Sequence, residues 1–110
     1  MNQEETEIAI IFKNDKKSIV DFFLDFSKKY HNFNDKNIIL DFSKTKEVLI
    51  ENILLFLQHS KQHKNNGMSF VIVVNGIDID NVPDEIITVP TLIEAKDIVE
   101  MENIERDLGF

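Results

Sequence analysis

The sequence predicts a single α/β domain over residues 1–110, with a four-stranded, mostly parallel sheet in sequential order and packed helices. Two apolar runs, at residues 37–42 and 70–74, are short and flanked by polar turns, which is typical of strands buried on both faces. The segment between them, at 47–64, is long and rich in apolar residues, as expected for a helix. A strand, a helix and a strand of these lengths form a right-handed parallel crossover.

The composition agrees with one domain that folds without covalent staples. The chain has 110 residues, of which 43% are hydrophobic and nine are Phe. It has no cysteine, which excludes disulfides and thiolate metal sites. The beginning of the chain is acidic, unlike a signal peptide, and no apolar run approaches the ~18 residues of a transmembrane helix. We therefore expect a cytoplasmic protein with no membrane partner.

The negative charge is concentrated in the C-terminal third of the chain. The formal net charge is −8, and residues 1–77 hold as many acids as bases. The remaining residues contain many acids and only two bases, Lys96 and Arg106. A phosphate backbone would be repelled by this third, so direct nucleic-acid binding is not expected. A solvated helix face explains the acids, and a site for a basic partner is the alternative.

The first third of the chain predicts a strand followed by a helix. The strand covers residues 7–13, which are mainly apolar on both faces. Ser18 is placed to cap the helix, with Asp21 as the acidic partner of a capping box. The helix then carries an aromatic-rich stripe at helical spacing, formed by Ile19, Phe22, Phe23, Phe26 and Tyr30.

The second predicted helix carries more apolar residues than one surface stripe requires. Leu49, Ile53, Phe56 and Leu57 suffice to pack it on the sheet, while Ile50 and Leu54 lie to one side. Either neighbouring helices bury Ile50 and Leu54, or these two residues belong to a contact surface.

The C-terminal third predicts an exposed loop, a short strand and a last helix. The loop covers residues 77–85 and the strand residues 86–89. Thr91 and Glu94 form a capping box that opens the helix. Gly109 is placed to end that helix in a left-handed conformation, with Phe110 able to fold back.

From residue 37 onward the chain resembles a STAS domain, the module shared by sulfate transporter tails and anti-sigma factor antagonists. The resemblance rests on the apolar strand ending at 39–43, on the long helix that runs into a Gly-ended turn, and on the segment Val-Pro-Thr-Leu-Ile-Glu-Ala at 89–95. The chain departs from the family in two ways. The N-terminal strand pair is expected to be a single strand, and residues 49–52 hold no hydroxyl where the family has its regulatory serine or threonine.

The resemblance implies a non-catalytic, regulatory protein–protein interaction module without the usual phosphorylation switch. It implies that the partner binds around the start of the second helix, where free N–H groups and lysines favour an acidic or phosphorylated segment. Ser43 and Thr45 are either a shifted phosphorylation site or helix caps. We expect no cofactor, and a monomer or weak homodimer. The expected partner-binding residues are Ser43, Lys44, Thr45, Lys46, Ile50 and Leu54.

Enzymatic interpretations have less support. His59 and His63 have the spacing of a helical metal-binding pair, giving a weak metal-dependent hydrolase as one alternative, but no acid lies beside them. Asp78 and Asp80 lack the glycine of a calcium loop. The ending at 98–110 is similar to short bacterial proteins labelled ribonuclease Z, yet the dense His/Asp cluster of that nuclease is missing. An accessory subunit associated with an RNA-processing enzyme is therefore the other alternative.

Overall fold

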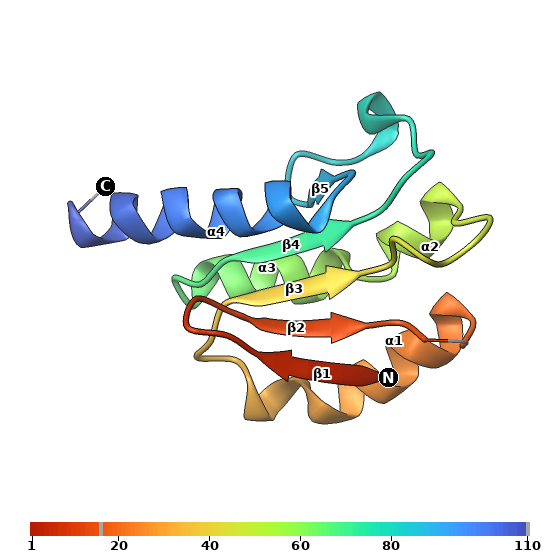
Figure 1. Ribbon diagram of the computed structural model, residues 1–110, viewed down its shortest axis with the longest axis horizontal. Coiled ribbons are helices and arrows are strands. Elements are labelled where there is room, and N and C mark those ends of the chain that lie inside the picture. The colour runs from red at the N-terminus through yellow and green to blue at the C-terminus, as the bar shows by residue number, and fades with distance from the viewer. Residues whose placement is uncertain (16, 110) are drawn as a thin grey trace.

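The computed structural model describes residues 1–15 and 17–109, and it has one five-stranded sheet with helices on both faces (Figure 1). β1 is antiparallel to β2, and the other strands are parallel. The sequential order and the parallel pairing of the predicted strands are confirmed, but the predicted count of four strands is wrong. The strands, in their order across the sheet, are β1 (Asn2–Glu5), β2 (Ile10–Lys13), β3 (Ile38–Asp41), β4 (Phe70–Val73) and β5 (Ile87–Val89).

The unpredicted strand is β1, so the expectation of a single N-terminal strand is also wrong. All four β1 residues are exposed, because this strand forms the edge of the sheet and meets solvent on both faces. The turn into β2 is held by Thr6, whose hydroxyl donates to the Ala9 carbonyl (2.9 Å) and accepts from the Ala9 N–H (3.1 Å). A polar edge strand of this kind carries no apolar alternation that a sequence reading can detect.

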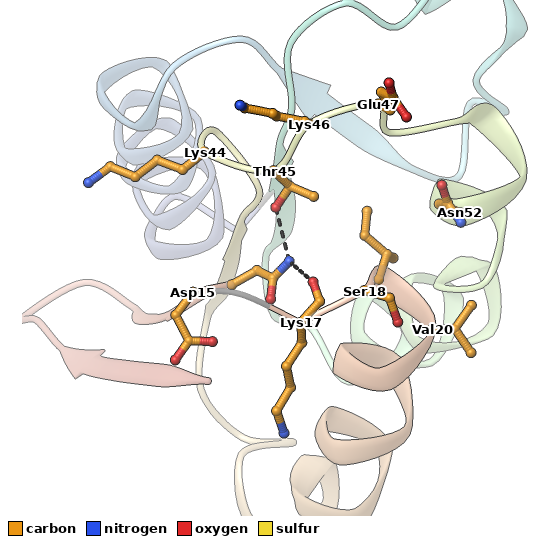
Figure 2. A pocket seen from close by; sticks show the side chains of 11 residues that line it. Asp15, Lys17, Ser18, Val20, Lys44, Thr45, Lys46, Glu47 and Asn52 are labelled. Carbon is orange, nitrogen blue, oxygen red and sulfur yellow. Dashed lines mark hydrogen bonds between the residues drawn. The ribbon is translucent and has the colours of Figure 1, made fainter.

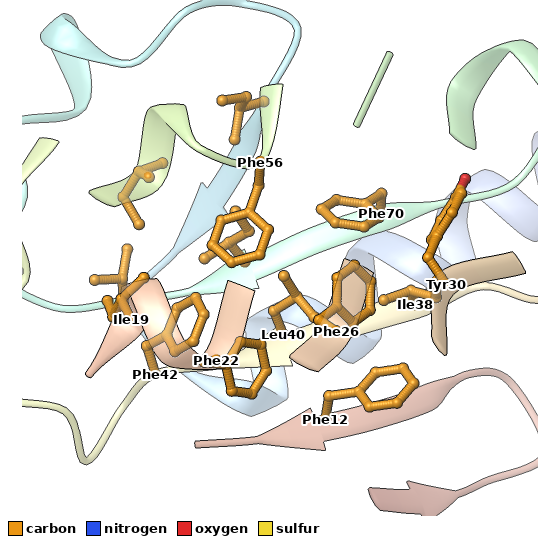
Figure 3. Packing of buried hydrophobic residues seen from close by; sticks show 14 of the residues in the cluster. Phe12, Ile19, Phe22, Phe26, Tyr30, Ile38, Leu40, Phe42, Phe56 and Phe70 are labelled. Atoms are coloured by element: carbon orange, nitrogen blue, oxygen red, sulfur yellow. The ribbon is translucent and has the colours of Figure 1, made fainter. Parts of the chain in front are cut away.

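One face of the sheet is covered by α1 (Ile19–Lys29), which the short 3₁₀ helix η1 (Tyr30–Asn32) extends. The Ser18 side chain accepts a hydrogen bond from the Asp21 N–H (3.1 Å), which confirms the predicted cap. The aromatic stripe of α1 meets rings from the sheet and from the next helical segment in one cluster (Figure 3). Its most deeply buried rings, none more than 1% exposed, are Phe12, Phe22, Phe26, Phe42, Phe56 and Phe70.

The predicted long helix is two helices, α2 (Ile50–Leu54) and α3 (Leu57–Asn65), with a break at Leu55 and Phe56. The break places Phe56 edge-to-face with Phe22 and Phe23. The buried residues Ile53, Phe56, Ser60 and His63 keep helical spacing across the break. The prediction of one continuous helix is wrong. Of the apolar residues outside this buried face, Leu49 and Leu54 are exposed.

The other face of the sheet is covered by α4 (Leu92–Asp107), which follows the 3₁₀ helix η2 (Ile79–Asn81) and β5. The Thr91 side chain accepts from the Glu94 N–H (3.1 Å), which confirms the second predicted cap. Gly109 has a φ of +81°, as its predicted role in ending the helix requires. The expectation for Phe110 lies outside the described residues. Ala95 and Val99 are fully buried against β3 and β4.

A polar network ties α4 to the N-terminal ends of β3 and β4. Arg106 donates to the Ser69 hydroxyl and to the Asn37 side-chain oxygen, both at 3.1 Å. Asn37 in turn donates to the Asn103 side chain (3.0 Å) and to the Ile8 carbonyl (2.9 Å). These bonds fix where the C-terminal half of α4 lies. None of the helices in the described part of the chain is long and apolar enough to cross a membrane.

Candidate partner-binding site

The C-terminal ends of β2 and β3 open into a hollow of about 550 Å³ (Figure 2). One wall is the loop from β2 to α1 with the first turn of α1, and the other wall is the loop from β3 to α2. In open parallel sheets this edge is where ligands most often bind, because the loops that follow the strands converge there. The hollow is lined by Asn14, Asp15, Lys17, Ser18, Ile19, Val20, Lys44, Thr45, Lys46, Glu47 and Asn52.

Asn14 is the buried polar residue of the hollow. It is only 5% exposed, and its side-chain nitrogen donates to the Lys17 carbonyl (2.8 Å) and to the Thr45 hydroxyl (3.0 Å). Both partners are acceptors here, so this orientation of the amide is fixed. The side-chain oxygen has no hydrogen-bond partner within the described ranges 1–15 and 17–109. A buried acceptor without a partner is uncommon in folded proteins, which marks Asn14 as a candidate functional residue.

The cations of the hollow stand at its rim. Lys44 and Lys46 are exposed and project outward from the β3–α2 loop (Figure 2), and neither ammonium forms an ion pair in the part of the chain that the structure covers. Lys17 is different, because its ammonium is hydrogen-bonded to the Asp25 carboxylate in the second turn of α1. That hydrogen bond raises the pKa of Lys17 and lowers the pKa of Asp25. Lys44 and Lys46 are therefore the cations of the lining that form no ion pair among the described residues, and Asp15 and Glu47 add negative charge to the same lining.

The four predicted loop residues do lie together, but in a role other than helix capping. Thr45 is half-buried and accepts from Asn14, whereas Ser43 is exposed and its N–H donates to the Asp41 side chain (2.9 Å). Helix α2 begins only at Ile50, too far along the chain for Ser43 or Thr45 to cap it. The capping interpretation is therefore wrong, and Ser43 lines a smaller neighbouring hollow of about 270 Å³ that shares Asn14 and Lys44 with the first.

The predicted apolar part of the site is displaced. Neither Ile50 nor Leu54 lines the hollow. Ile50 is half-buried and Leu54 is 38% exposed, while Leu49 is more exposed than either at 59%. The second helix starts at Ile50, several residues after Ser43 and Thr45, and at its start the Leu49 N–H donates to the Asn52 side chain (2.9 Å). The first turn of α1 lines the hollow through Ile19 and Val20, and α2 contributes Asn52.

Sequence reasoning missed three uncharged polar residues of the hollow, Asn14, Ser18 and Asn52, and three charged ones. The charged residues are Asp15, Lys17 and Glu47. A usable signal was present for Asn14. It directly follows the first predicted strand, and a polar residue at that position lies at the edge of a parallel sheet where loops meet. Nothing in the sequence placed Asn52 near Asn14, because the start of α2 was predicted several residues too early.

The β3–α2 loop holds the only positive backbone φ of a non-glycine residue among the described positions. Glu47 has a φ of +56°, a conformation that costs an L-residue roughly 1–2 kcal/mol. Such strain is retained where the surrounding structure holds the loop in one conformation, and it concentrates at functional sites. Glu47 lines the hollow beside Lys46.

The two histidines are not arranged as a metal pair. His63 is fully buried. Its Nε2 lies 2.6 Å from the Lys36 carbonyl and must donate, which leaves Nδ1 to accept from the Tyr30 hydroxyl at 2.8 Å. His59 is hydrogen-bonded to the Ser27 hydroxyl (2.9 Å). Within residues 1–15 and 17–109, no group of three or more His, Cys, Asp or Glu side chains is placed to hold a metal ion.

Burial lowers the pKa of both histidines, so the neutral rings are favoured. For His63 the hydrogen bond to the Lys36 carbonyl partly opposes that effect, and for His59 the nearby His63 adds to it. Burial also raises the pKa of Tyr30, which keeps the hydroxyl protonated as the donor to His63. This cluster joins α1 to α3.

Asp78, one of the acids weighed for calcium, has a local structural role. Its carboxylate accepts from the Asp80 N–H (3.0 Å) and so caps the 3₁₀ helix η2. Asp80 itself is exposed.

Comparison with known proteins assigns no family. No protein-family model matches the chain, and no curated protein matches it either.

Proposed function

We propose that this chain is a non-catalytic, regulatory protein–protein interaction module of STAS type that lacks the family's phosphorylatable hydroxyl. Its docking site for an acidic or phosphorylated segment of a partner protein is the hollow between the β2–α1 and β3–α2 loops. The observation that carries the proposal is the unsatisfied side-chain oxygen of Asn14, buried in a hollow whose rim holds the unpaired Lys44 and Lys46.

The three groups together select for a ligand with two features. Lys44 and Lys46 attract an anion, but an anion without hydrogens offers nothing to the Asn14 oxygen. A peptide segment supplies both features, because its backbone N–H groups donate and its carboxylate or phosphate side chain is anionic. The exposed lysines steer such a segment to the hollow, and the buried amide fixes its position.

The state of the histidines supports a non-catalytic role. Both ring nitrogens of His63 are already hydrogen-bonded within the chain, which leaves no lone pair for a metal or a substrate. Catalytic bases need a free nitrogen within reach of the reacting group, and His63 is fully buried. The histidine cluster therefore acts in the packing of α1 on α3.

The proposal is tested by presenting the folded chain with an array of immobilised peptides, in which each acidic sequence appears with and without phosphoserine. The double substitution Lys44→Glu/Lys46→Glu reverses the rim charge. It should weaken binding of the best acidic or phosphorylated peptides at least about tenfold, equivalent to about 1.4 kcal/mol. It should leave the fold intact, because exposed substitutions usually change stability by no more than ~0.5 kcal/mol.

The matched control is Lys28→Glu/Lys61→Glu, which makes the same charge change on exposed positions of α1 and α3. If binding depends only on net charge, the two double variants will weaken it equally and the assignment of the hollow is wrong. Asn14→Ala separates the buried amide from the rim charges: it should reduce affinity without changing the salt dependence of binding. Failure of the array to yield any peptide that binds the wild-type chain also contradicts the proposal.

A further inference from the structure

Helix α4 is apolar on two opposite faces. The inner face packs on the sheet through Ala95 and Val99. On the outer side, positions 93, 101, 104 and 108 recur at the spacing of one helical face, and nothing in the described part of the chain covers them. These outer residues, called the α4 stripe below, are Ile93, Met101, Ile104 and Leu108, which are 74%, 56%, 59% and 65% exposed.

Acidic residues border the α4 stripe on both sides. On a helix with 3.6 residues per turn, Glu100 and Asp107 fall along one border, and Glu94 and Glu105 fall along the other. All four are exposed. Asp97 lies within the stripe itself. The α4 stripe thus extends about 22 Å along four turns of helix, interrupted by Asp97 between Ile93 and Met101, and carboxylates frame it on both sides.

The bases of α4 do not neutralise this frame. Arg106 points inward, where it donates to Ser69 and Asn37. Lys96 is the only other base on the helix, and it is half-buried. The acids of the C-terminal third are therefore more than a solvated surface. They surround apolar side chains whose exposure to water is unfavourable.

The negative charge around the α4 stripe disfavours three of four kinds of occupant for such a surface. A second copy would bring its own acidic frame against this one, with no exposed arginine to pair with it. An anionic lipid surface or a nucleic acid would be repelled in the same way. A partner helix with an apolar stripe and basic flanks would bury the apolar side chains of the α4 stripe and pair with the carboxylates beside it. Amphipathic helices bind apolar surfaces in this way.

We propose that α4 is a second docking surface, which binds a basic amphipathic helix of a partner protein. This surface lies across the sheet from α1 and α3, and it shares no residue with the hollow at the strand ends. It is therefore independent of the proposed function, and a chain with both surfaces joins an acidic segment to a basic helix.

The test uses the full chain and a synthetic 18-residue helical peptide of Leu and Lys in amphipathic order. A scrambled peptide of the same composition has the same charge without the apolar stripe. Titration calorimetry should show binding of the amphipathic peptide at least about tenfold tighter than binding of the scrambled one. Met101→Gln/Ile104→Gln should weaken that binding by at least about tenfold, because it removes apolar contact and keeps good helix formers.

Two controls keep the result specific. Leu24→Gln/Ile79→Gln removes the same kind of exposed apolar group from α1 and η2, and it should change affinity less than about twofold. Glu100→Gln/Glu105→Gln should weaken binding and flatten its salt dependence, whereas Glu5→Gln/Glu7→Gln, with the same net charge, should have a smaller effect.

Three results would overturn the proposal. Equal binding of the scrambled peptide would mean that charge alone is recognised. Unchanged affinity in Met101→Gln/Ile104→Gln would mean that the peptide binds elsewhere. A dimer of the wild-type chain in sedimentation equilibrium, dissociated by the same substitution, would mean that a second copy covers the α4 stripe.

Discussion

The two ends of the sheet each carry a buried asparagine, and the two residues differ in how completely they are bonded. Asn37, at the N-terminal end of β3, makes four hydrogen bonds: two from its nitrogen and two to its oxygen. Asn14, at the C-terminal end of β2, makes two from its nitrogen and none to its oxygen among the described residues. The same side chain is thus fully satisfied at one end and half satisfied at the other.

We relate this difference to two roles: the N-terminal end of the strands contributes to stability, and the C-terminal end is the proposed binding site. At the N-terminal end, Asn37 links three parts of the chain that are far apart in the sequence, so its bonds hold the fold together. At the C-terminal end, an unsatisfied acceptor, two unpaired lysines and the strained Glu47 meet in one hollow. The unsatisfied acceptor and the strained backbone each cost stability in the free chain, and the proposed ligand would pair with the acceptor and the lysines.

Replacing the two asparagines should give the largest effect and the sharpest contrast. Asn37→Ala removes four hydrogen bonds and leaves buried partners unsatisfied, so we expect it to lower the free energy of unfolding by about 3 kcal/mol. Asn14→Ala removes two bonds together with a buried unpartnered acceptor, and about 1 kcal/mol is expected. Urea denaturation of both variants measures the difference. Equal losses would show that the two ends are not distinct.

The next effect concerns the partners of Asn37. Arg106→Met keeps the aliphatic stem and removes the donors to Ser69 and Asn37, so a loss of about 2 kcal/mol is expected. Hydrogen exchange should increase most in the C-terminal half of α4. Lys96→Met on the same helix is the control, with a change within ~0.5 kcal/mol. If the two substitutions cost the same, the network does not anchor α4.

Acidic pH should lower the free energy of unfolding through His63, which is hydrogen-bonded to the Lys36 carbonyl beside Asn37. The pKa of buried His63 is lowered below its usual 6.5, so the unfolded chain takes up a proton before the folded chain does. The stabilising contribution is complete above the unfolded value and is lost as pH falls through it toward the lower folded value. Urea denaturation at pH 7.5 and pH 5.5 should show lower stability at the acidic pH.

His63→Gln isolates this contribution, since it should reduce the loss of stability between the two pH values. The exposed His31→Gln should leave that loss unchanged. A wild-type chain equally stable at both pH values would contradict the assignment of His63 as a neutral, buried link between α1 and α3.

The smallest change in stability is expected at the C-terminal end of the strands, where the substitution should stabilise the chain. Glu47→Gly relieves a left-handed conformation at the cost of some backbone entropy, so it should raise stability by no more than about 1 kcal/mol. Glu51→Gly, in α2, should instead lower it by about 0.5–1 kcal/mol. Thermal denaturation distinguishes the two. Destabilisation by Glu47→Gly would mean that the loop is not strained.

The sequence predicted the helix caps and strands that depend on neighbouring residues in the chain. Ser18 and Thr91 form the caps that their spacing indicated, and β2 to β5 follow the apolar runs. β1 was not predictable in this way, because its four exposed residues owe their strand conformation to pairing with β2 and not to their own pattern.

The position of the candidate site could be predicted from the sequence, but several of its lining residues could not. Lys44 and Lys46 were expected at the strand ends, and they are there. The break at Phe56 is a tertiary effect of packing against Phe22 and Phe23, so no helical period in the sequence announces it. Predicting one helix places its start closer to Ser43 and Thr45, which is why capping was one of the two interpretations of these residues. Asn14 and Asn52 meet in the hollow only because α2 begins at Ile50.

The most direct test of the contrast is an amide chemical-shift map of the ¹⁵N-labelled chain, titrated with the best acidic or phosphorylated peptide from the array. The account predicts shifts at residues 14–20 and 43–52, around Asn14, and almost none at 36–37, 68–69 and 103–106, around Asn37. Shifts that cluster at the N-terminal end of the strands, or that spread evenly over the sheet, would contradict it.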